Sequence, residues 1–140
     1  MGVKKWLFSE ELVDDYEIIE VERLFGFKLP DDYKKCVMKN NGGFPEPNTF
    51  DCDDDGGIES VFNDLISFTN KDLNIKMFSE FSKRGLLPFG RDPFGHLLCF
   101  DYNENIDCPR VVFYNCEETG SILVTPICRT FTDLLNRLYS

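Results

Sequence analysis

Residues 51–59, with the sequence DCDDDGGIE, hold the densest group of potential ligand atoms in the chain. Carboxylates that alternate on a tight glycine turn offer hard oxygens to Ca²⁺, and Asp51, Asp53 and Asp55 fit the first half of an EF-hand loop. The twelfth position of such a loop requires a bidentate Glu, but it is Phe62 here. Because half of the ligand set is missing, a solvated acidic turn is favoured and no metal is predicted.

The same acidic loop is the candidate partner-binding surface. Its carboxylates concentrate negative potential, which speeds encounter with a basic protein. Charge supplies steering more than affinity, so apolar anchors are needed, and two phenylalanines flank the loop in sequence. Core packing explains both phenylalanines equally well, because buried Phe is common. The candidate residues are Phe44, Phe50, Asp51, Asp53, Asp54, Asp55 and Glu59.

No residue pattern in the chain predicts a catalytic site or a cofactor. His96 is the single histidine, and nothing in the sequence indicates a nucleophile beside it. The glycine-rich phosphate loop, the nucleophile elbow and the paired-histidine zinc motif are absent. Asp92, Asp101 and Glu104 are acids that the fold could bring together, but surface charges are the commoner explanation. We therefore expect no catalytic residues.

The net charge of −10 limits the classes of partner. It repels nucleic acid and anionic membranes and attracts basic proteins, although solubility alone also explains it. The six cysteines form no C-x-x-C pair. The first twelve residues contain no apolar run long enough for a signal peptide, so a reducing cytoplasm is expected. No segment has the length of a membrane span.

Three helices are expected in the first part of a single domain, residues 1–140. Capping-box spacing and a glycine stop predict a helix over 14–25. Leu-Pro-Asp-Asp at 29–32 begins a second helix, which ends before the Asn-Gly-Gly of 41–43. Leu73, Met77 and Phe81 recur every four residues and predict a third helix, capped by Asn70 and ending near Lys83.

The rest of the chain has the pattern of strands and one closing helix. Residues 44–57 are expected to form a loop, followed by a short strand over 58–62. Further strands are expected over 96–102, 110–116 and 121–125. Thr130 and Asp133 have capping-box spacing before an amphipathic C-terminal helix. This order indicates an α+β fold with N-terminal helices, a central, mostly antiparallel sheet and a C-terminal helix.

Four sequence blocks follow one another along the chain. They are GFKLPDDYKKCVMKNNGGFP from residue 26, LLPFGRDPFGHLLCFDYN from residue 86, PRVVFYNCEE from residue 109 and ICRTFTDLLNRLYS from residue 127. In this order, the four blocks resemble the SUKH superfamily. The resemblance implies that the matched residues determine the fold, with the glycines in turns and Phe131 in the core. It carries over no catalytic residue. Trp6 lies outside these blocks, either packed on the domain or exposed as an anchor.

The resemblance implies that the protein functions by binding a partner. Bacterial members of this superfamily serve chiefly as immunity proteins, each neutralising a partner toxin that is often a nuclease. We therefore predict an immunity protein that binds a cognate polymorphic toxin with a basic surface. There are two alternatives. One is a regulatory scaffold, which some eukaryotic relatives resemble, and the other is a Ca²⁺-dependent binding module. Nothing in the sequence indicates an oligomeric state.

Overall fold

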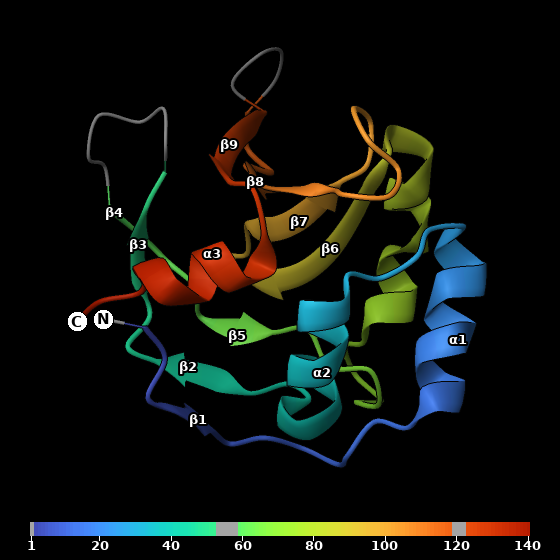
Figure 1. The fold of residues 1–140 in the computed structure, drawn as a ribbon, viewed down its shortest axis with the longest axis horizontal. Coiled ribbons are helices and arrows are strands. Elements are labelled where there is room, and N and C mark those ends of the chain that lie inside the picture. Colours follow the sequence, from blue (N-terminus) through green and yellow to red (C-terminus); the bar gives the residue numbers. More distant parts are fainter. Residues whose placement is uncertain (1, 53–58, 119–122) are drawn as a thin grey trace.

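The protein has an α+β fold, seen here in a computed structural model that describes residues 2–52, 59–118 and 123–140. A five-stranded antiparallel sheet lies at its centre, as Figure 1 shows, with helices packed around it. Its strands, in spatial order, are β5 (Asp64–Leu65), β6 (Leu86–Arg91), β7 (Leu97–Asp101), β8 (Arg110–Tyr114) and β9 (Val124–Cys128). The predicted fold class is confirmed. Within the described residues, no helix is both long and apolar enough to span a membrane.

The helix boundaries follow the local capping signals. Helix α1 (Asp15–Phe25) begins with a complete capping box, in which Asp14 Oδ1 accepts the Glu17 N–H at 2.9 Å, and ends at Gly26 with φ of 78°. Helix α2 (Asp31–Asn40) follows Pro30. Thr130 caps helix α3 (Phe131–Arg137) by accepting the Asp133 N–H at 3.0 Å. These three predictions are confirmed.

The third predicted helix differs in type and start. It is a 3₁₀ helix, η1 (Ile75–Arg84), and its cap is Asn74 rather than Asn70. A 3₁₀ helix has three residues per turn, which places Ile75, Phe78 and Phe81 on one side. The predicted apolar stripe, with one residue in every four, is therefore wrong. Ile75 is fully buried whereas Met77 is 54% exposed.

Two short antiparallel ribbons lie beside the central sheet, and they correct the loop predicted over 44–57. Strand β1 (Lys5–Leu7) pairs with β2 (Phe44–Glu46), and β3 (Thr49–Asp51) pairs with β4 (Glu59–Val61). Because of the prolines near residues 45–47, the sequence pattern did not predict strands β2 and β3. Pairing with distant segments decided their conformation. Residues 53–58, part of the predicted loop, lie outside the described residues.

Strands β7 and β8 confirm two predicted strands. Strand β9 overlaps the third, predicted over 121–125, of which residues 121 and 122 lie outside the described residues. Strand β6 was not predicted, because its Leu-Pro-Phe-Gly sequence is typical of a turn. A register shift between Pro88 and Gly90 accommodates the proline within the pairing. A Cβ at Gly90 would lie 2.8 Å from the Phe62 ring, so only glycine fits there without displacement.

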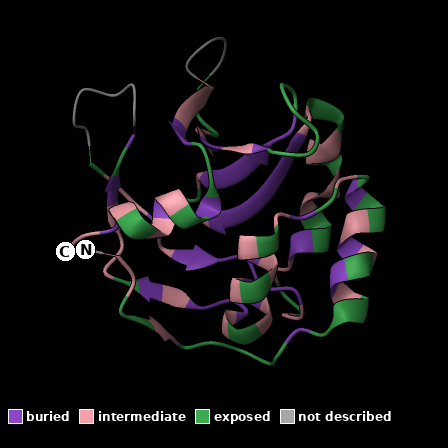
Figure 2. Cartoon of the chain, in the orientation of Figure 1, coloured by how far each residue is buried: buried purple, intermediate pink, exposed green. Residues whose placement is uncertain are grey.

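An aromatic cluster forms the centre of the core and joins α2, the sheet and α3. The Tyr33 ring lies 5.8 Å from Phe89, 5.1 Å from Phe100 and 5.4 Å from Phe131. Phe89 and Phe100 stack on neighbouring strands at 4.4 Å. Figure 2 shows β6 and β7 buried almost throughout. These rings hold the helices in fixed positions on the sheet.

Tyr33 brings a polar group into this cluster. Its side chain is fully buried, and its hydroxyl has no hydrogen-bond partner among the residues that the structure describes. Burial raises the pKa of this phenol well above its ordinary value. We expect Tyr33→Phe to raise the free energy of unfolding by about 1 kcal/mol, because it removes an unpaired buried hydroxyl and keeps the ring. Urea unfolding measures this, and a loss of stability of similar size would contradict it.

Candidate partner-binding surface

The acidic ends of β3 and β4 are the described part of the predicted acidic loop. Asp51 and Glu59 are exposed and face each other across the two strands. Two carboxylates in this position repel each other. Their charges together give these strand ends a concentrated negative potential. Asp53, Asp54 and Asp55 lie outside the described residues, so both the favoured solvated acidic turn and the Ca²⁺-binding alternative stay untested predictions.

Tyr139 packs against this acidic ribbon, which we define as Asp51 and Glu59 with strands β3 and β4. Its hydroxyl donates to Asp51 Oδ1 at 3.0 Å, and Thr49 forms a β-bridge with its backbone. Desolvation, together with the carboxylates of Asp51 and Glu59, raises the pKa of Tyr139 to about 12. The chain's C-terminal segment therefore fixes the base of the acidic ribbon in place.

The two predicted aromatic anchors do not flank the acidic ribbon. Phe50 is fully buried, which places it in the core and removes it from the candidate surface. Phe44 is half-buried and belongs to the other ribbon, where it is paired with Leu7. Its ring contacts Phe8 edge-to-face at 5.8 Å. In the described part of the acidic ribbon, neither Phe44 nor Phe50 therefore supplies the exposed apolar contact expected beside the charges.

The polar residues that could have formed a catalytic group are separated or already engaged. Asp92 accepts the backbone N–H groups of Phe94 and His96, at 2.9 and 2.7 Å, in the β6–β7 turn. Asp101 lies at the other end of β7, where its carboxylate accepts from Arg110 Nε at 3.2 Å. Glu104 Oε1 is 3.9 Å from Nη2 of the same Arg110. Of the three acids considered together from the sequence, Asp101 and Glu104 therefore share a partner, and Asp92 lies apart.

His96 and Cys116 lie side by side without the geometry of a catalytic pair. His96 Nδ1 accepts the Cys116 backbone N–H at 3.1 Å, and the Cys116 thiol points to the Gly95 carbonyl at 3.7 Å. Desolvation, Asp92 and Glu117 raise the pKa of the Cys116 thiol. A nucleophilic cysteine needs the opposite shift. This contact ties the β6–β7 turn to the end of β8.

A buried polar network, not anticipated from the sequence, surrounds the Asn-Gly-Gly turn after α2. Asn41 is fully buried. Its Nδ2 donates to the Glu11 carbonyl at 3.1 Å and to Thr69 Oγ1 at 2.9 Å, while its Oδ1 accepts the Phe68 N–H at 2.7 Å. Glu10 Oε1 accepts from Ser67 Oγ at 2.8 Å. Asn41 thus joins the segment before α1 to the segment after β5.

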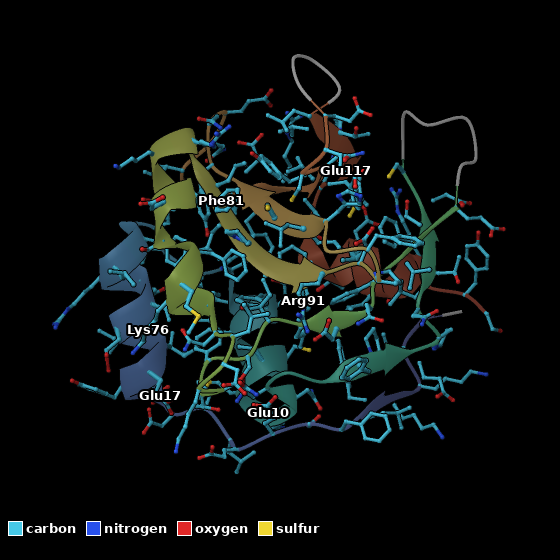
Figure 3. The ribbon with its side chains drawn as sticks, turned by 180° about the vertical axis from the view of Figure 1, so that it is seen from behind. Glu10, Glu17, Lys76, Phe81, Arg91 and Glu117 are labelled. Atoms are coloured by element: carbon cyan, nitrogen blue, oxygen red, sulfur yellow. The ribbon has the colours of Figure 1, made fainter. Side chains whose placement is uncertain are left out.

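An ion pair lies next to this network. Arg91 Nη2 is 2.6 Å from Asp64 Oδ2, and the Asp64 side chain is only 6% exposed. Glu10, Asp64, Ser67 and Arg91 line a hollow of about 250 Å³, and Figure 3 shows Glu10 and Arg91 on this side of the molecule. Glu10 and Asp64 already have partners here, so these two carboxylates help to hold β5, β6 and the segment before α1 together.

Trp6, left open by the sequence, packs on the domain. Its ring is half-buried and contacts Phe62 edge-to-face at 6.1 Å. A Cβ at Gly43 would lie 3.3 Å from the Trp6 ring and 2.8 Å from Ser9 Oγ, so glycine allows this close approach. Of the two roles that the sequence left open for Trp6, the structure shows packing on the domain.

Comparison with known proteins agrees with this arrangement of fold-determining residues. The model of the SMI1 / KNR4 family (SUKH-1) matches residues 12–137, from the entry to α1 to the last residue of α3. No match was found among curated proteins. Leu29, Asn41 and Phe131, from blocks that resemble the superfamily, are all buried. The chain belongs to the SMI1 / KNR4 family (SUKH-1).

Proposed function

We propose that this protein is an immunity protein, which binds a cognate polymorphic toxin in the cytoplasm and blocks its action. Membership of a family that includes toxin-immunity proteins is the observation that carries the proposal. The net charge of −10 supports a partner with a basic surface. The described polar clusters hold turns and strands together, which is consistent with a role in binding.

The mode of action is occupation of the toxin's surface. A nuclease toxin must hold a phosphate backbone, so the surface around its active site is basic. An acidic protein is attracted to that surface and competes with the nucleic acid for it. Asp51 and Glu59, exposed on the acidic ribbon, contribute to this attraction.

Co-expression tests the proposed function directly. The probe is the toxin domain encoded by the neighbouring reading frame, expressed in a host cell with and without this chain. Growth arrest by the toxin alone and recovery with this chain are expected. Continued arrest, without a stable complex of the two purified proteins, would contradict immunity. Stable binding of several cellular proteins without recovery would instead indicate a scaffold.

The acidic ribbon is expected to affect the rate of association. Asp51→Asn with Glu59→Gln should slow association with the toxin roughly two- to five-fold at about 0.01 M salt, where electrostatic attraction is long-ranged. Dissociation should stay unchanged, because exposed charges at the rim of an interface act mainly on the association rate. Stopped-flow fluorescence measures both rates. Asp51→Glu with Glu59→Asp, which keeps the charge, is the matched control; an association rate equal in both variants would exclude the ribbon from steering.

A further inference from the structure

Helix α1 has apolar side chains on both of its faces. Ile18, Val21 and Phe25 face the core and are at most 4% exposed. On the outer side, Tyr16 is 67% and Ile19 is 44% exposed. A helix that covers a core normally has a polar outer face, so apolar residues on both sides indicate a second contact surface.

Helix α2 provides the comparison within the same protein. Its exposed positions are Asp31, Lys35 and Lys39, all of them charged. Its apolar residues Tyr33 and Val37 are fully buried. The outer face of α2 is therefore typical of a solvated helix, and the apolar outer face of α1 is a specific feature of that helix. Figure 2 shows α1 at the edge of the molecule with this outer side exposed.

The exposed apolar residues of α1 continue into a hollow. Tyr16 and Ile19 are three residues apart and lie on the same side of the helix. Leu12, 74% exposed, lies in the segment that leads into the helix. Beyond Ile19, a hollow of about 440 Å³ is lined by Ile19, Glu22, Arg23, Gly26, Phe27 and Lys28. We call Leu12, Tyr16, Ile19 and this hollow the α1 face.

The floor of the hollow is rigid. The Phe27 ring stacks on Tyr102 with centroids 4.2 Å apart and an angle of 5° between the planes. The Tyr102 hydroxyl donates to the Lys28 carbonyl at 2.7 Å, which fixes the chain after α1. A preformed apolar hollow next to exposed anchor residues lowers the entropy cost of binding.

The helix segment that carries the α1 face is strongly acidic, whereas the hollow at its end is lined by Glu22 together with Arg23 and Lys28. Residues 10–25 include a single base, Arg23, and seven acids, which are Glu10, Glu11, Asp14, Asp15, Glu17, Glu20 and Glu22. This segment alone therefore supplies more than half of the net charge of −10. Lys76 of η1 is 3.0 Å from Glu20 and compensates one of these acids. Figure 3 shows Glu17 on α1 and Lys76 on the neighbouring η1.

We propose that the α1 face docks a basic protein element with an apolar ridge, and that this element belongs to the toxin of the proposed function, on which this inference rests. Apolar contacts at the centre and carboxylates around them match an element that is cationic at its rim. A second copy of this chain would place the same carboxylates against each other, and an anionic membrane would be repelled in the same way.

The α1 face and the acidic ribbon have different roles. Figure 1 shows them at opposite edges of the molecule. The described part of the acidic ribbon has exposed charge, whereas its predicted anchor Phe50 is buried in the core. The α1 face combines both kinds of contact. It therefore determines the lifetime of the complex, whereas the ribbon contributes to the rate of encounter.

A defined peptide tests the chemistry of the face without the toxin. The probe is a fluorescent, amphipathic peptide of lysine and leucine, about 18 residues long, or five helical turns. Fluorescence anisotropy measures its Kd for the wild type, for Tyr16→Ser with Ile19→Ser, and for the control Phe94→Ser with Ile106→Ser, which removes exposed apolar groups elsewhere. We expect the Kd to rise roughly ten-fold or more in the first variant and to stay within about two-fold in the control. Equal Kd values in all three proteins, or equal binding of a scrambled peptide, would overturn the inference.

The toxin separates this inference from the proposed function. Rescue of growth by the wild type and its loss in Tyr16→Ser with Ile19→Ser, with an unchanged Tm, supports both. Full rescue by both proteins overturns the α1 face and leaves immunity intact. Failure of the wild type to rescue overturns immunity, and the peptide result then decides the α1 face. Self-association that depends on Tyr16 and Ile19, seen by sedimentation, would show that a second copy is the occupant and overturn the choice of partner.

Discussion

Phe131→Ala is expected to lower the free energy of unfolding by about 3–5 kcal/mol, the range for removing a buried aromatic ring from a packed core. Phe131 is 1% exposed, and its ring lies 5.4 Å from Tyr33 and 5.5 Å from Phe89. Phe131 is also the first residue of α3, so its ring lies where the start of this helix meets the sheet. The large cavity left by its removal would lie where α2, the sheet and α3 meet.

Urea unfolding followed by tryptophan fluorescence and by circular dichroism measures this loss. Phe94→Ala is the matched control, because the same ring is removed from a position that is 83% exposed. We expect the control to stay within about 0.5 kcal/mol of the wild type. A loss in Phe131→Ala no larger than that of the control would show that the aromatic cluster does not determine stability.

Asn41→Ala is expected to lower the free energy of unfolding by about 3 kcal/mol, mainly because it leaves a buried backbone donor without an acceptor. That donor is the Phe68 N–H, which is 2.7 Å from Asn41 Oδ1. The substitution also removes the contacts with Glu11 and Thr69, which hold the segment before α1. The effect combines an unpaired buried group with the loss of a link between distant segments.

Asn40→Ala separates this effect from a general weakening of the α2 C-terminus. Asn40 is the neighbouring residue of the same type and is half-buried. Its amide donates to Cys36 of α2, at 2.9 Å to the carbonyl and 3.8 Å to Sγ. A loss of at most about 1 kcal/mol is expected there. Hydrogen exchange at Phe68 should accelerate in Asn41→Ala and not in Asn40→Ala. Equal effects of the two substitutions would contradict the role of Asn41 as a junction.

The residues that resemble the family and the residues proposed for recognition occupy different parts of the molecule. Asn41, Phe89 and Phe131 are buried and determine how the elements pack. Tyr16 and Ile19 project from the outer side of α1 and contribute little to that packing. A scaffold built in this way keeps its fold when its exposed residues change, because those residues contribute little to the core.

The candidate surface was only partly predictable from the sequence. Residues 51–59 are conspicuous because their charges are adjacent in the chain. The α1 face is less conspicuous, because Tyr16 and Ile19 lie among acids in a helix with a clear buried stripe. One feature of the sequence does indicate this face. Tyr16 and Ile19 fall outside the buried positions of Ile18, Val21 and Phe25. An apolar residue off the buried stripe is an indication of a second surface.

The sequence by itself determined the charge of the surface and the ends of α1, α2 and α3. Capping bonds such as the one between Asp14 and Glu17 connect residues three positions apart, so the local sequence is sufficient. Tertiary structure alone decided that Phe50 is buried, that Asp92 and Asp101 lie apart, and that residues 44–46 and 49–51 are strands. The physical reason is that burial and strand pairing depend on contacts between segments far apart in the chain, and these contacts form only when the whole core assembles.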